Sequence, residues 1–573
     1  MLQMILRKIA GYCGGAHRYW IPFLCGLLYS LGLPPFSSML HPVFALMPLL
    51  SFVALTPFFF FATMKPRRRA LVYSYIYCAA MILGQHYWIG FVTADGFWAL
   101  ILIGVALISL AWGALYFVAA LAFRFCARRI PRLYIAVYPA FWVLVEYFRT
   151  LTDLAFPWSY IGYGAVGILP LAQFSSFTGV WGLSYIAVLG NIVIWELLRA
   201  YKSGDNAQQK WLVFGMWAAL TAGIFVWGSF RMNREPPNAG TSRIALLQSY
   251  MDQFNWGKGS LDTAVTVSDS MVWAVVQEKP DLIIFSESAL LCYLDRRPDI
   301  RRHVLTWADR AGVPIIAGAL HWDRPSNPSL KDRYDVYNTV FLTDNGKLVP
   351  YHKILLVPFS EIMPFEARFP ILSRVNLGGA GFKRGSSESV FRINDNLEIA
   401  PYICYEIIFP SFVRRRLQES TNMLVNVTND GWFGRTSGPY QHAAMAQTRS
   451  IENGITLARS ANSGISMHVD PYGRILSKSG LYTRETIVKD VPTYRIMTFY
   501  TRFGDWFVIF CAILTAAGIC AGLIRKRRPG EITNPLLVEE QNLTPVNICQ
   551  LEGTKPLNME GTPPLRGEPY PTL

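Results

Sequence analysis

Long apolar runs fill most of the first 230 residues, and a different pattern follows them. A transmembrane helix needs about 20 mostly apolar residues. Eight segments meet this requirement and predict membrane-spanning helices, at residues 20–36, 42–63, 70–90, 97–123, 133–150, 179–198, 211–230 and 505–524. No small-residue cleavage site follows the first apolar run. We therefore interpret the first segment as an uncleaved anchor rather than a signal peptide.

Basic residues gather in every second loop between these segments. The clusters are Arg7–Lys8, Lys65–Arg69, Arg124–Arg132, Arg199–Lys210 and Arg525–Arg528. The alternate loops, near 91–96 and 151–178, contain neither Lys nor Arg. Because short cytoplasmic loops carry the excess of these residues, the pattern places both termini in the cytoplasm. Residues 231–504 then lie on the other side of the membrane.

Residues 242–492 show short β-rich runs that alternate with polar or helical stretches. The predicted strands are Ile244–Gln248, Asp281–Ser286, Val313–Leu320, Tyr337–Asp344, Glu398–Cys404, Met423–Thr428 and Ile465–Asp470. Between the first two strands, Leu261–Glu278 has a broadly helical apolar spacing. Strands that alternate with helices predict a layered α/β domain. About 250 residues are enough for one well-buried core.

These patterns divide the chain into four parts. Residues 1–230 form an N-terminal membrane domain with seven transmembrane helices, and residues 231–504 form the extramembrane domain. Residues 505–524 form a C-terminal transmembrane helix. The tail, residues 525–573, is rich in Pro, Gly, Glu and Asn with little apolar periodicity. We expect the tail to be disordered and cytoplasmic.

Composition and charge fit this division. The 573 residues include 53 Lys and Arg against 38 Asp and Glu, a net charge of +15. Nucleic-acid binding is the usual first interpretation of a basic protein, but 17 of the basic residues lie in the five loop clusters. The excess charge is therefore a signal of membrane topology. The apolar runs of membrane-spanning length exclude a wholly soluble chain. A hydrophobic content of 52% and an aromatic content of 14% exclude a largely disordered one.

Three polar residues directly follow apolar strand-like runs, where α/β domains build their sites. They are Glu287, Lys353 and Cys404. Taken singly, each has a simpler structural interpretation: an exposed loop carboxylate, a solvated charge and a small core residue. Cys292 is the other cysteine of the extramembrane segment, so a Cys292–Cys404 disulfide is an alternative to a free nucleophile. The sequence has no Cys-x-x-Cys or paired-His spacing, and we predict no metal site.

In this order at strand ends, the three residues resemble the Glu-Lys-Cys triad of the nitrilase, or carbon–nitrogen hydrolase, superfamily. With membrane helices on both sides, the chain resembles the apolipoprotein N-acyltransferase family of the bacterial inner membrane over about residues 20–524. Further segments that carry the resemblance are Phe141–Arg149, Phe156–Trp158, Gly179–Gly182, Asn429–Gly434 and Gln441–His442. The chain differs at Ser360, where the family has Gly, and at Leu355, where a His is frequent.

The resemblance implies a bundle of eight transmembrane helices that carries a periplasmic α-β-β-α sandwich of the nitrilase type. It assigns the nucleophile to Cys404, the general base to Glu287 and the oxyanion-stabilising charge to Lys353, with no cofactor. Supporting roles fall to Glu361, Tyr405 and Glu406. Trp256 and Trp432 would line the route of the acyl chain, with simple packing as the alternative for Trp256.

The implied reaction transfers a fatty acyl chain from a phospholipid, phosphatidylethanolamine in the family, to a lipoprotein. The chain passes through a thioester on Cys404 to the N-terminal α-amino group of an S-diacylglyceryl-cysteine apolipoprotein, the last step of lipoprotein maturation. A thiolate suits this task because its thioester reacts with amines. The apolar loop 362–372 beside Glu361 is expected to dip into the outer leaflet as a lid.

Two alternatives stand beside this function. A membrane-anchored amidase or nitrilase would use the same triad with water as the acceptor. A transporter or lipid-binding protein would carry an inactive outer domain. Eight spans without an obvious inverted repeat or several intramembrane charges argue against transport.

Overall fold

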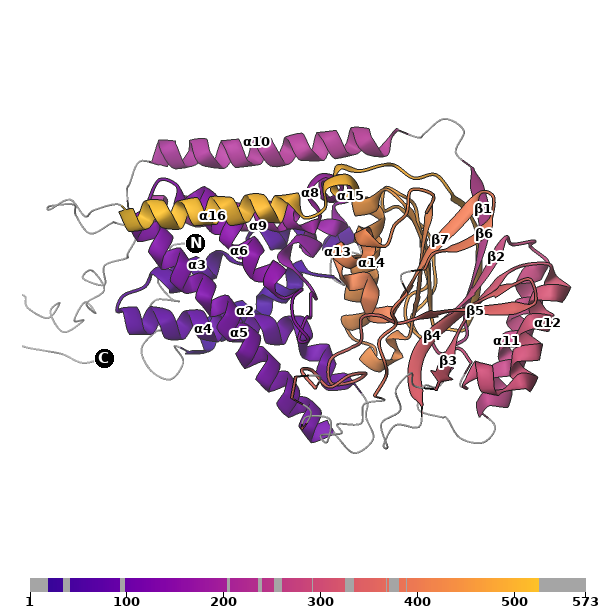
Figure 1. The fold of residues 1–573 in the computed structure, drawn as a ribbon. Helices are drawn as coiled ribbons and strands as arrows, with labels where there is room; N and C mark the ends of the chain where they lie inside the picture. The colour runs from indigo at the N-terminus through magenta and orange to yellow at the C-terminus, as the bar shows by residue number, and fades with distance from the viewer. Residues whose placement is uncertain are drawn as a thin grey trace, which may run out of the picture.

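The protein has a helical part and a two-sheet part that lie side by side (Figure 1). This computed structural model describes residues 19–34, 42–92, 98–203, 207–234, 240–251, 260–290, 292–324, 334–366, 368, 369, 371, 381–387 and 389–524. The predicted disorder of the tail concerns residues 525–573, which lie outside the described residues.

Each of the eight predicted spans contains a helix. They are α2 (Trp20–Tyr29), η3 (Pro42–Phe52) with α3 (Thr56–Thr63), α4 (Arg67–His86), α5 (Trp98–Arg129), α6 (Tyr134–Phe148), α9 (Val180–Ser203), α10 (Ala207–Met232) and α16 (Trp506–Ile524). Pro48 lies inside the second segment and Pro57 at its α-helical start. Because proline lacks an N–H group and clashes with the preceding turn, this segment is split rather than one continuous α-helix.

Four helices among the described residues are long and apolar enough to cross a membrane. They are Ile101–Arg129, Val180–Tyr201, Gln208–Met232 and Trp506–Ile524. Three shorter apolar helices, Trp20–Gly32, Met47–Thr63 and Tyr134–Phe148, accompany them. The helix α10 lies along the edge of the helical part (Figure 1). It exposes large apolar side chains such as Trp211 and Phe230. A helix with such a surface is suited to a lipid environment.

Two six-stranded sheets form the second part. One has the order β12-β1-β2-β3-β4-β5 and the other β11-β10-β9-β8-β7-β6. The first contains β1 (Thr241–Gln248), β2 (Leu282–Phe285), β3 (Ile315–Asp323), β4 (Asp335–Asp344), β5 (Lys347–His352) and β12 (Glu485–Pro492). The second contains β6 (Phe391–Asn394), β7 (Leu397–Ile403), β8 (Met423–Thr428), β9 (Thr456–Ala461), β10 (Met467–Val469) and β11 (Ile475–Lys478). All seven predicted strands are confirmed in position.

The central strands of each sheet are parallel and buried on both faces. The parallel neighbours are β1, β2 and β3 in one sheet and β7, β8 and β9 in the other. Residues such as Ile284 and Val425 share one core cluster between the sheets. Burial on both faces explains why these strands are continuous apolar runs in the sequence.

Helices cover both outer faces, which gives an α-β-β-α sandwich. On the first sheet, α11 (Ser260–Val276) and α12 (Pro298–Ala311) contribute Val272 and Trp307 to a second core cluster. On the second sheet, α13 (Pro410–Arg415) and α14 (Gly438–Asn453) lie between the strands and the helical part (Figure 1). Their cluster continues into the membrane helices through Trp181 and Phe507. One apolar core therefore joins the two parts.

Candidate active site

The three residues singled out in the sequence lie at the carboxyl ends of strands in the two facing sheets. Glu287 follows β2, Lys353 follows β5 and Cys404 follows β7. Glu287 is 7% exposed and Lys353 is 1% exposed, while Cys404 is partly exposed. Face-to-face packing of the sheets thus brings together side chains that are far apart in the sequence.

Lys353 lies between two carboxylates. Its Nζ is 2.9 Å from Glu361 Oε1 and 3.6 Å from Glu287 Oε1. The Asn338 amide, on β4, donates hydrogen bonds to both glutamates, at 2.8 Å and 3.1 Å. Burial alone would lower the pKa of Lys353, but Glu361 and Glu287 outweigh it and raise the pKa. The ammonium is therefore a fixed positive charge in a buried site.

Glu287 has the properties of a buried base beside a thiol. Burial raises the pKa of its carboxyl, while Lys353 and hydrogen bonds from Asn338 and the Cys404 side chain act in the opposite direction. The backbone N–H of Asn429 donates to Glu287 Oε2 at 2.9 Å. A raised pKa makes a carboxylate a stronger base near neutral pH.

The pKa of the Cys404 thiol is also raised, first by burial and then by the charge of Glu287, whereas Lys353 lowers it. Without substrate the group is thus a neutral thiol with a carboxylate in hydrogen-bonding contact. Such a pair forms the thiolate by proton transfer to the neighbouring base, as in other activated nucleophiles. The arrangement fits a nucleophile that is activated during the reaction.

Cys404 has a strained backbone conformation. Its φ angle is +50°, in the left-handed region, where the chain turns from β7 into η8 (Cys404–Ile408). A residue other than glycine pays about 1–2 kcal/mol for this conformation. Strain of this kind persists where surrounding contacts enforce it, and such positions cluster in active sites.

Glu406 supplies contacts that hold this turn. Its carboxylate accepts hydrogen bonds from the Ile403 N–H at 2.7 Å, the Ile354 N–H at 2.6 Å and the Leu355 N–H at 3.3 Å. The Tyr351 hydroxyl lies 2.9 Å from both carboxylate oxygens. Glu406 is fully buried. It therefore ties the end of β7, next to Cys404, to the segment on either side of Lys353.

A second polar network lies behind Cys404. The His442 ring lies between the Asp430 carboxylate, 2.8 Å from Nδ1, and the Cys404 carbonyl oxygen, 3.2 Å from Nε2. Asp430 also accepts a hydrogen bond from Arg459 at 2.7 Å. Although burial opposes it, the charge of Arg459, with His442, lowers the pKa of Asp430 to about 2. The network holds the backbone carbonyl of Cys404 through His442.

The helical part reaches the site through the loop after α6. The Arg149 guanidinium donates to the carbonyl oxygens of Phe156 and Trp158, at 3.0 Å and 2.8 Å. The Phe156 ring stacks on Tyr405 with centroids 6.2 Å apart, and the Tyr405 hydroxyl donates to the carbonyl of Ala155. Tyr405, which directly follows Cys404, therefore connects the turn that carries the thiol to the helical part.

The remaining predicted residues have different outcomes. Trp432, on η9 (Asp430–Phe433), is 38% exposed, whereas Trp256 lies outside the described residues. Cys292 and Cys404 are free thiols, so the alternative of a disulfide between them is wrong. In the lid segment, the Phe365 N–H donates to Asp153 at 3.1 Å. Insertion of this loop into the membrane stays a prediction.

Sequence reasoning gave no role to Asn338 or Arg459, or to the pair Asp430 and His442. Asn338 lies within a strand, and Arg459 within a buried one. Asp430 and His442 lie in two of the segments that carry the family resemblance, and a buried strand that contains an arginine is unusual. These two features could have pointed to the network. Within the described ranges, no group of three or more His, Cys, Asp or Glu side chains is arranged to hold a metal ion.

Comparisons with known proteins identify the family of the chain. The family model for carbon-nitrogen hydrolases matches residues 243–498, and that for the apolipoprotein N-acyltransferase N-terminal domain matches residues 25–193. An apolipoprotein N-acyltransferase of Rickettsia prowazekii is 31% identical over 461 residues, which cover 78% of this chain and 88% of the relative. One from Geobacter metallireducens is 28% identical over 518 residues, which cover 89% of this chain and 96% of the relative.

Among solved structures, an amidase of the nitrilase superfamily from Nesterenkonia is 19% identical with a TM-score of 0.35, covering 48% of this chain and 98% of the amidase. The curated relatives match both the helical part and the sandwich over nearly their full length. The chain is therefore an acyltransferase and belongs to the apolipoprotein N-acyltransferase family.

Proposed function

We propose that the protein transfers a fatty acyl chain from a phospholipid, with phosphatidylethanolamine as the expected donor, to the N-terminal α-amino group of an S-diacylglyceryl-cysteine apolipoprotein. The observation that carries the proposal is the contact of the Cys404 thiol with Glu287, beside the buried Lys353 ammonium. This set provides a nucleophile, a base and a fixed positive charge.

In the first half-reaction, Glu287 takes the thiol proton as the Cys404 sulfur attacks the ester carbonyl of the phospholipid. The tetrahedral oxyanion forms next to Lys353, whose ammonium has three N–H donors. Two glutamates lie beside that ammonium, which leaves a donor for the oxyanion. Electrostatic stabilisation by one such donor is worth roughly 3 kcal/mol. Collapse expels the lysophospholipid oxygen, which takes the proton from Glu287, and the thioester remains.

In the second half-reaction, the neutral α-amino group of the apolipoprotein attacks the thioester carbonyl. Glu287 accepts a proton from the attacking nitrogen, and the sulfur leaves as the C–N bond forms. The proton then returns to the thiolate, which restores Cys404. Glu361 supports both steps because it holds Lys353 in place and offsets its charge. Tyr405 and Glu406 support the turn that carries the thiol.

We also propose eight spans with both termini in the cytoplasm and the sandwich, residues 231–504, in the periplasm. The cytoplasmic tail and the helix at 505–524 complete this topology. Single cysteines at Arg68 and Arg392, both exposed, test it with a membrane-impermeant maleimide on spheroplasts. We expect labelling at residue 392 before lysis and at residue 68 after lysis. The reverse order would refute the topology.

The activity is tested with purified protein and phosphatidylethanolamine by mass spectrometry of the peptide that contains Cys404. We expect a fatty acyl thioester that disappears when a diacylated lipopeptide is added, with one acyl chain gained by the lipopeptide. A thioester lost only to water would indicate a hydrolase. No adduct on the wild-type protein, or full activity of Cys404→Ser, would overturn the proposal. Trp432→Ala tests whether this residue lines the acyl route, as proposed with Trp256.

A further inference from the structure

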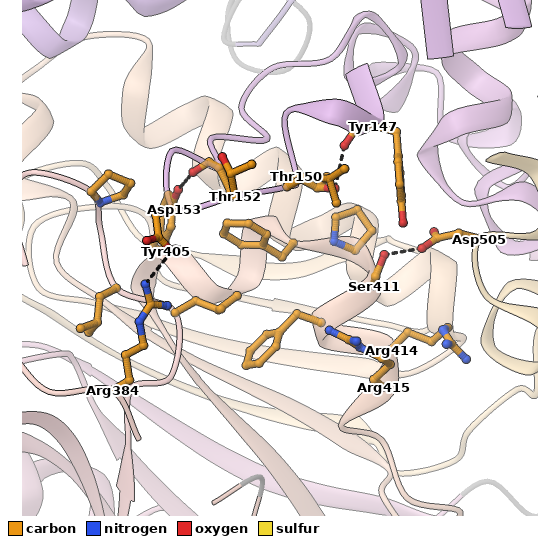
Figure 2. Close-up of a pocket in the computed structure, with 18 residues that line it drawn as sticks. Tyr147, Thr150, Thr152, Asp153, Arg384, Tyr405, Ser411, Arg414, Arg415 and Asp505 are labelled. Atoms are coloured by element: carbon orange, nitrogen blue, oxygen red, sulfur yellow. Dashed lines mark hydrogen bonds and ion pairs between the residues drawn. The ribbon is translucent and has the colours of Figure 1, made fainter. Parts of the chain in front are cut away.

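A pocket of about 330 Å³ lies where the helical part meets the sandwich (Figure 2). Its walls come from the loop that follows α6, from the end of η8 with α13, from Leu355 to Pro358 beyond Lys353, and from Asp505 just before α16. Tyr405, next to Cys404 in the sequence, forms part of the wall. The pocket is therefore a neighbour of the active site at the level where the membrane helices end.

The charged side chains of the pocket are three arginines, Arg384, Arg414 and Arg415, and two aspartates, Asp153 and Asp505. Among the described residues, the lining contains no Lys, His or Glu. Figure 2 shows Arg384 on one side and Arg414 with Arg415 on the other. Such a cavity, with an excess of guanidinium groups on opposite sides, suits an anion rather than a cation.

The aspartates are already occupied by protein donors. Asp505 accepts hydrogen bonds from the Trp181 indole at 3.0 Å, the Tyr500 hydroxyl at 3.1 Å and the Ser411 hydroxyl. Asp153 accepts from the Phe365 N–H at 3.1 Å and lies 3.5 Å from Arg384.

Two of the arginines have N–H groups that are available to a ligand. Arg414 donates from Nη1 to the Thr501 carbonyl at 3.2 Å, while its buried Nε has no partner among the described residues. Arg415 is exposed. Since a guanidinium carries five N–H donors, these side chains retain capacity for phosphate oxygens.

An apolar surface borders the pocket on the side of the membrane helices. Phe148, the last residue of α6, and Leu151, in the loop after it, are exposed. In the first turns of α16, Ile509 is 63% exposed and Ile513 is 64% exposed. The two helices pack against each other. A ligand that spans both surfaces has hydrocarbon chains on one side and an anionic group on the other.

We propose that this pocket binds the phosphodiester of a glycerophospholipid whose acyl chains lie along α6 and α16. The inference rests on the proposed function in that it assigns the headgroup site of the acyl donor. Arg415 and Arg384 contact the phosphate oxygens, and Tyr405 separates the headgroup from the thiol. The ester is thereby presented to Cys404 while the chains stay in the hydrocarbon layer, which avoids about 0.8 kcal/mol for each exposed CH₂ group.

The test compares donors with and without a phosphodiester on the full-length protein in detergent micelles. Arg415→Gln removes an exposed charge, Arg415→Lys keeps the charge without the planar fork, and Arg392→Gln, on the exposed β6 strand, is the matched control. Formation of acyl-Cys404 is measured with phosphatidylethanolamine and with diacylglycerol. We expect Arg415→Gln to raise KM for the phospholipid about tenfold, the effect of one lost hydrogen bond to a charged group. Diacylglycerol kinetics stay unchanged, and Arg415→Lys is intermediate.

An equal change for both donors, or no change for either, would overturn the inference. Glycerophosphoethanolamine, which has the phosphodiester but no chains, is expected to compete with the phospholipid, whereas inorganic phosphate at the same concentration competes less. If inorganic phosphate competes as well as glycerophosphoethanolamine, the pocket is a general anion site and the inference of a phosphodiester site is wrong. Native mass spectrometry of lipid retention by wild type and Arg415→Gln gives a readout without acyl transfer. A further outcome is that the wild-type protein forms no acyl-Cys404 and yet retains phospholipid that the Arg415→Gln variant does not retain. In that case the proposed function fails, while the assignment of the pocket stands.

Discussion

Gly318 on β3 lies directly against the backbone that carries Glu287. A Cβ atom at residue 318 would lie 2.4 Å from the Ser286 carbonyl oxygen and 2.9 Å from the Glu287 Cα. Such distances are too short for non-bonded atoms in a close-packed interior, so a side chain must displace the end of β2. We expect Gly318→Ala to slow formation of acyl-Cys404 roughly 10²-fold, the effect of a misplacement of about 1 Å.

The matched control is Gly215→Ala, where the new methyl group meets no described atom within 4 Å. This variant should acylate at the wild-type rate. Unfolding measurements should show a loss of about 1–3 kcal/mol for Gly318→Ala, as for other overpacked sites. A Gly318→Ala enzyme with normal acylation would mean that the close approach does not position Glu287.

Protonation of Glu287 should set the lower pH limit of acylation. The folded state raises the pKa of this carboxyl above its ordinary value of 4.5, and only the carboxylate accepts the thiol proton. The rate should therefore fall as the pH drops through this raised value. Glu287→Gln should lower the rate roughly 10²–10⁴-fold, the usual contribution of a general base. It should also remove the fall in rate at low pH. Single-turnover acylation between pH 4 and 9 measures both effects, and an unchanged acid limb in the variant would contradict them.

Glu406→Gln should weaken the turn that carries Cys404. All four groups around this carboxylate donate hydrogen bonds, so a Gln amide nitrogen faces a donor instead of an acceptor. We expect the free energy of unfolding to fall by about 1–3 kcal/mol, together with slower acylation. Glu398→Gln is the control, since this residue accepts hydroxyl hydrogen bonds at the opposite end of β7. Equal effects of the two variants would contradict a special role for Glu406.

Glu452 should make stability depend on pH. Burial raises its pKa to about 7, against the lowering influence of Arg449 and of the Val180 N–H, 2.9 Å away. The folded state therefore binds the proton more tightly than the unfolded state. Stability is highest below the unfolded pKa of about 4.5 and decreases as the pH rises towards 7, by about 3 kcal/mol from this group. Thermal unfolding at pH 5 and pH 7.5 measures the decrease.

Glu452→Gln should remove most of that difference, because an amide does not titrate. His468→Gln is the comparison: its pKa is lowered by burial, first of all, and by Lys489, so its loss of stability occurs at lower pH. A Glu452→Gln protein that keeps the full difference between pH 5 and pH 7.5 would show that other groups cause it.

The sequence was sufficient for the strands that end at Glu287 and Cys404, because strands buried on both faces are continuous apolar runs. It gave no bounds for β5, although Lys353 was expected to follow a strand-like run, and it did not predict β6, β9, β11 or β12. In β5 the exposed residues Lys347, Val349 and Pro350 mask the strand pattern. Residues whose importance depends on distant partners were also missed. Asn338 matters because it lies between two glutamates, and Gly318 because it lies against Glu287, and neither relation has a local signature.

The shared core between the sandwich and the membrane helices has one further consequence. Trp181 and Phe507 belong to the same buried cluster as the outer face of the second sheet, so the catalytic layer does not swing on a linker. Side-chain packing therefore fixes the distance between the sandwich and the helices that we propose to span the membrane. If the proposed topology holds, a lipid ester and a lipoprotein amine must both reach Cys404 at that one distance. We therefore expect substrate choice to depend on how far the reactive group stands from the lipid chains.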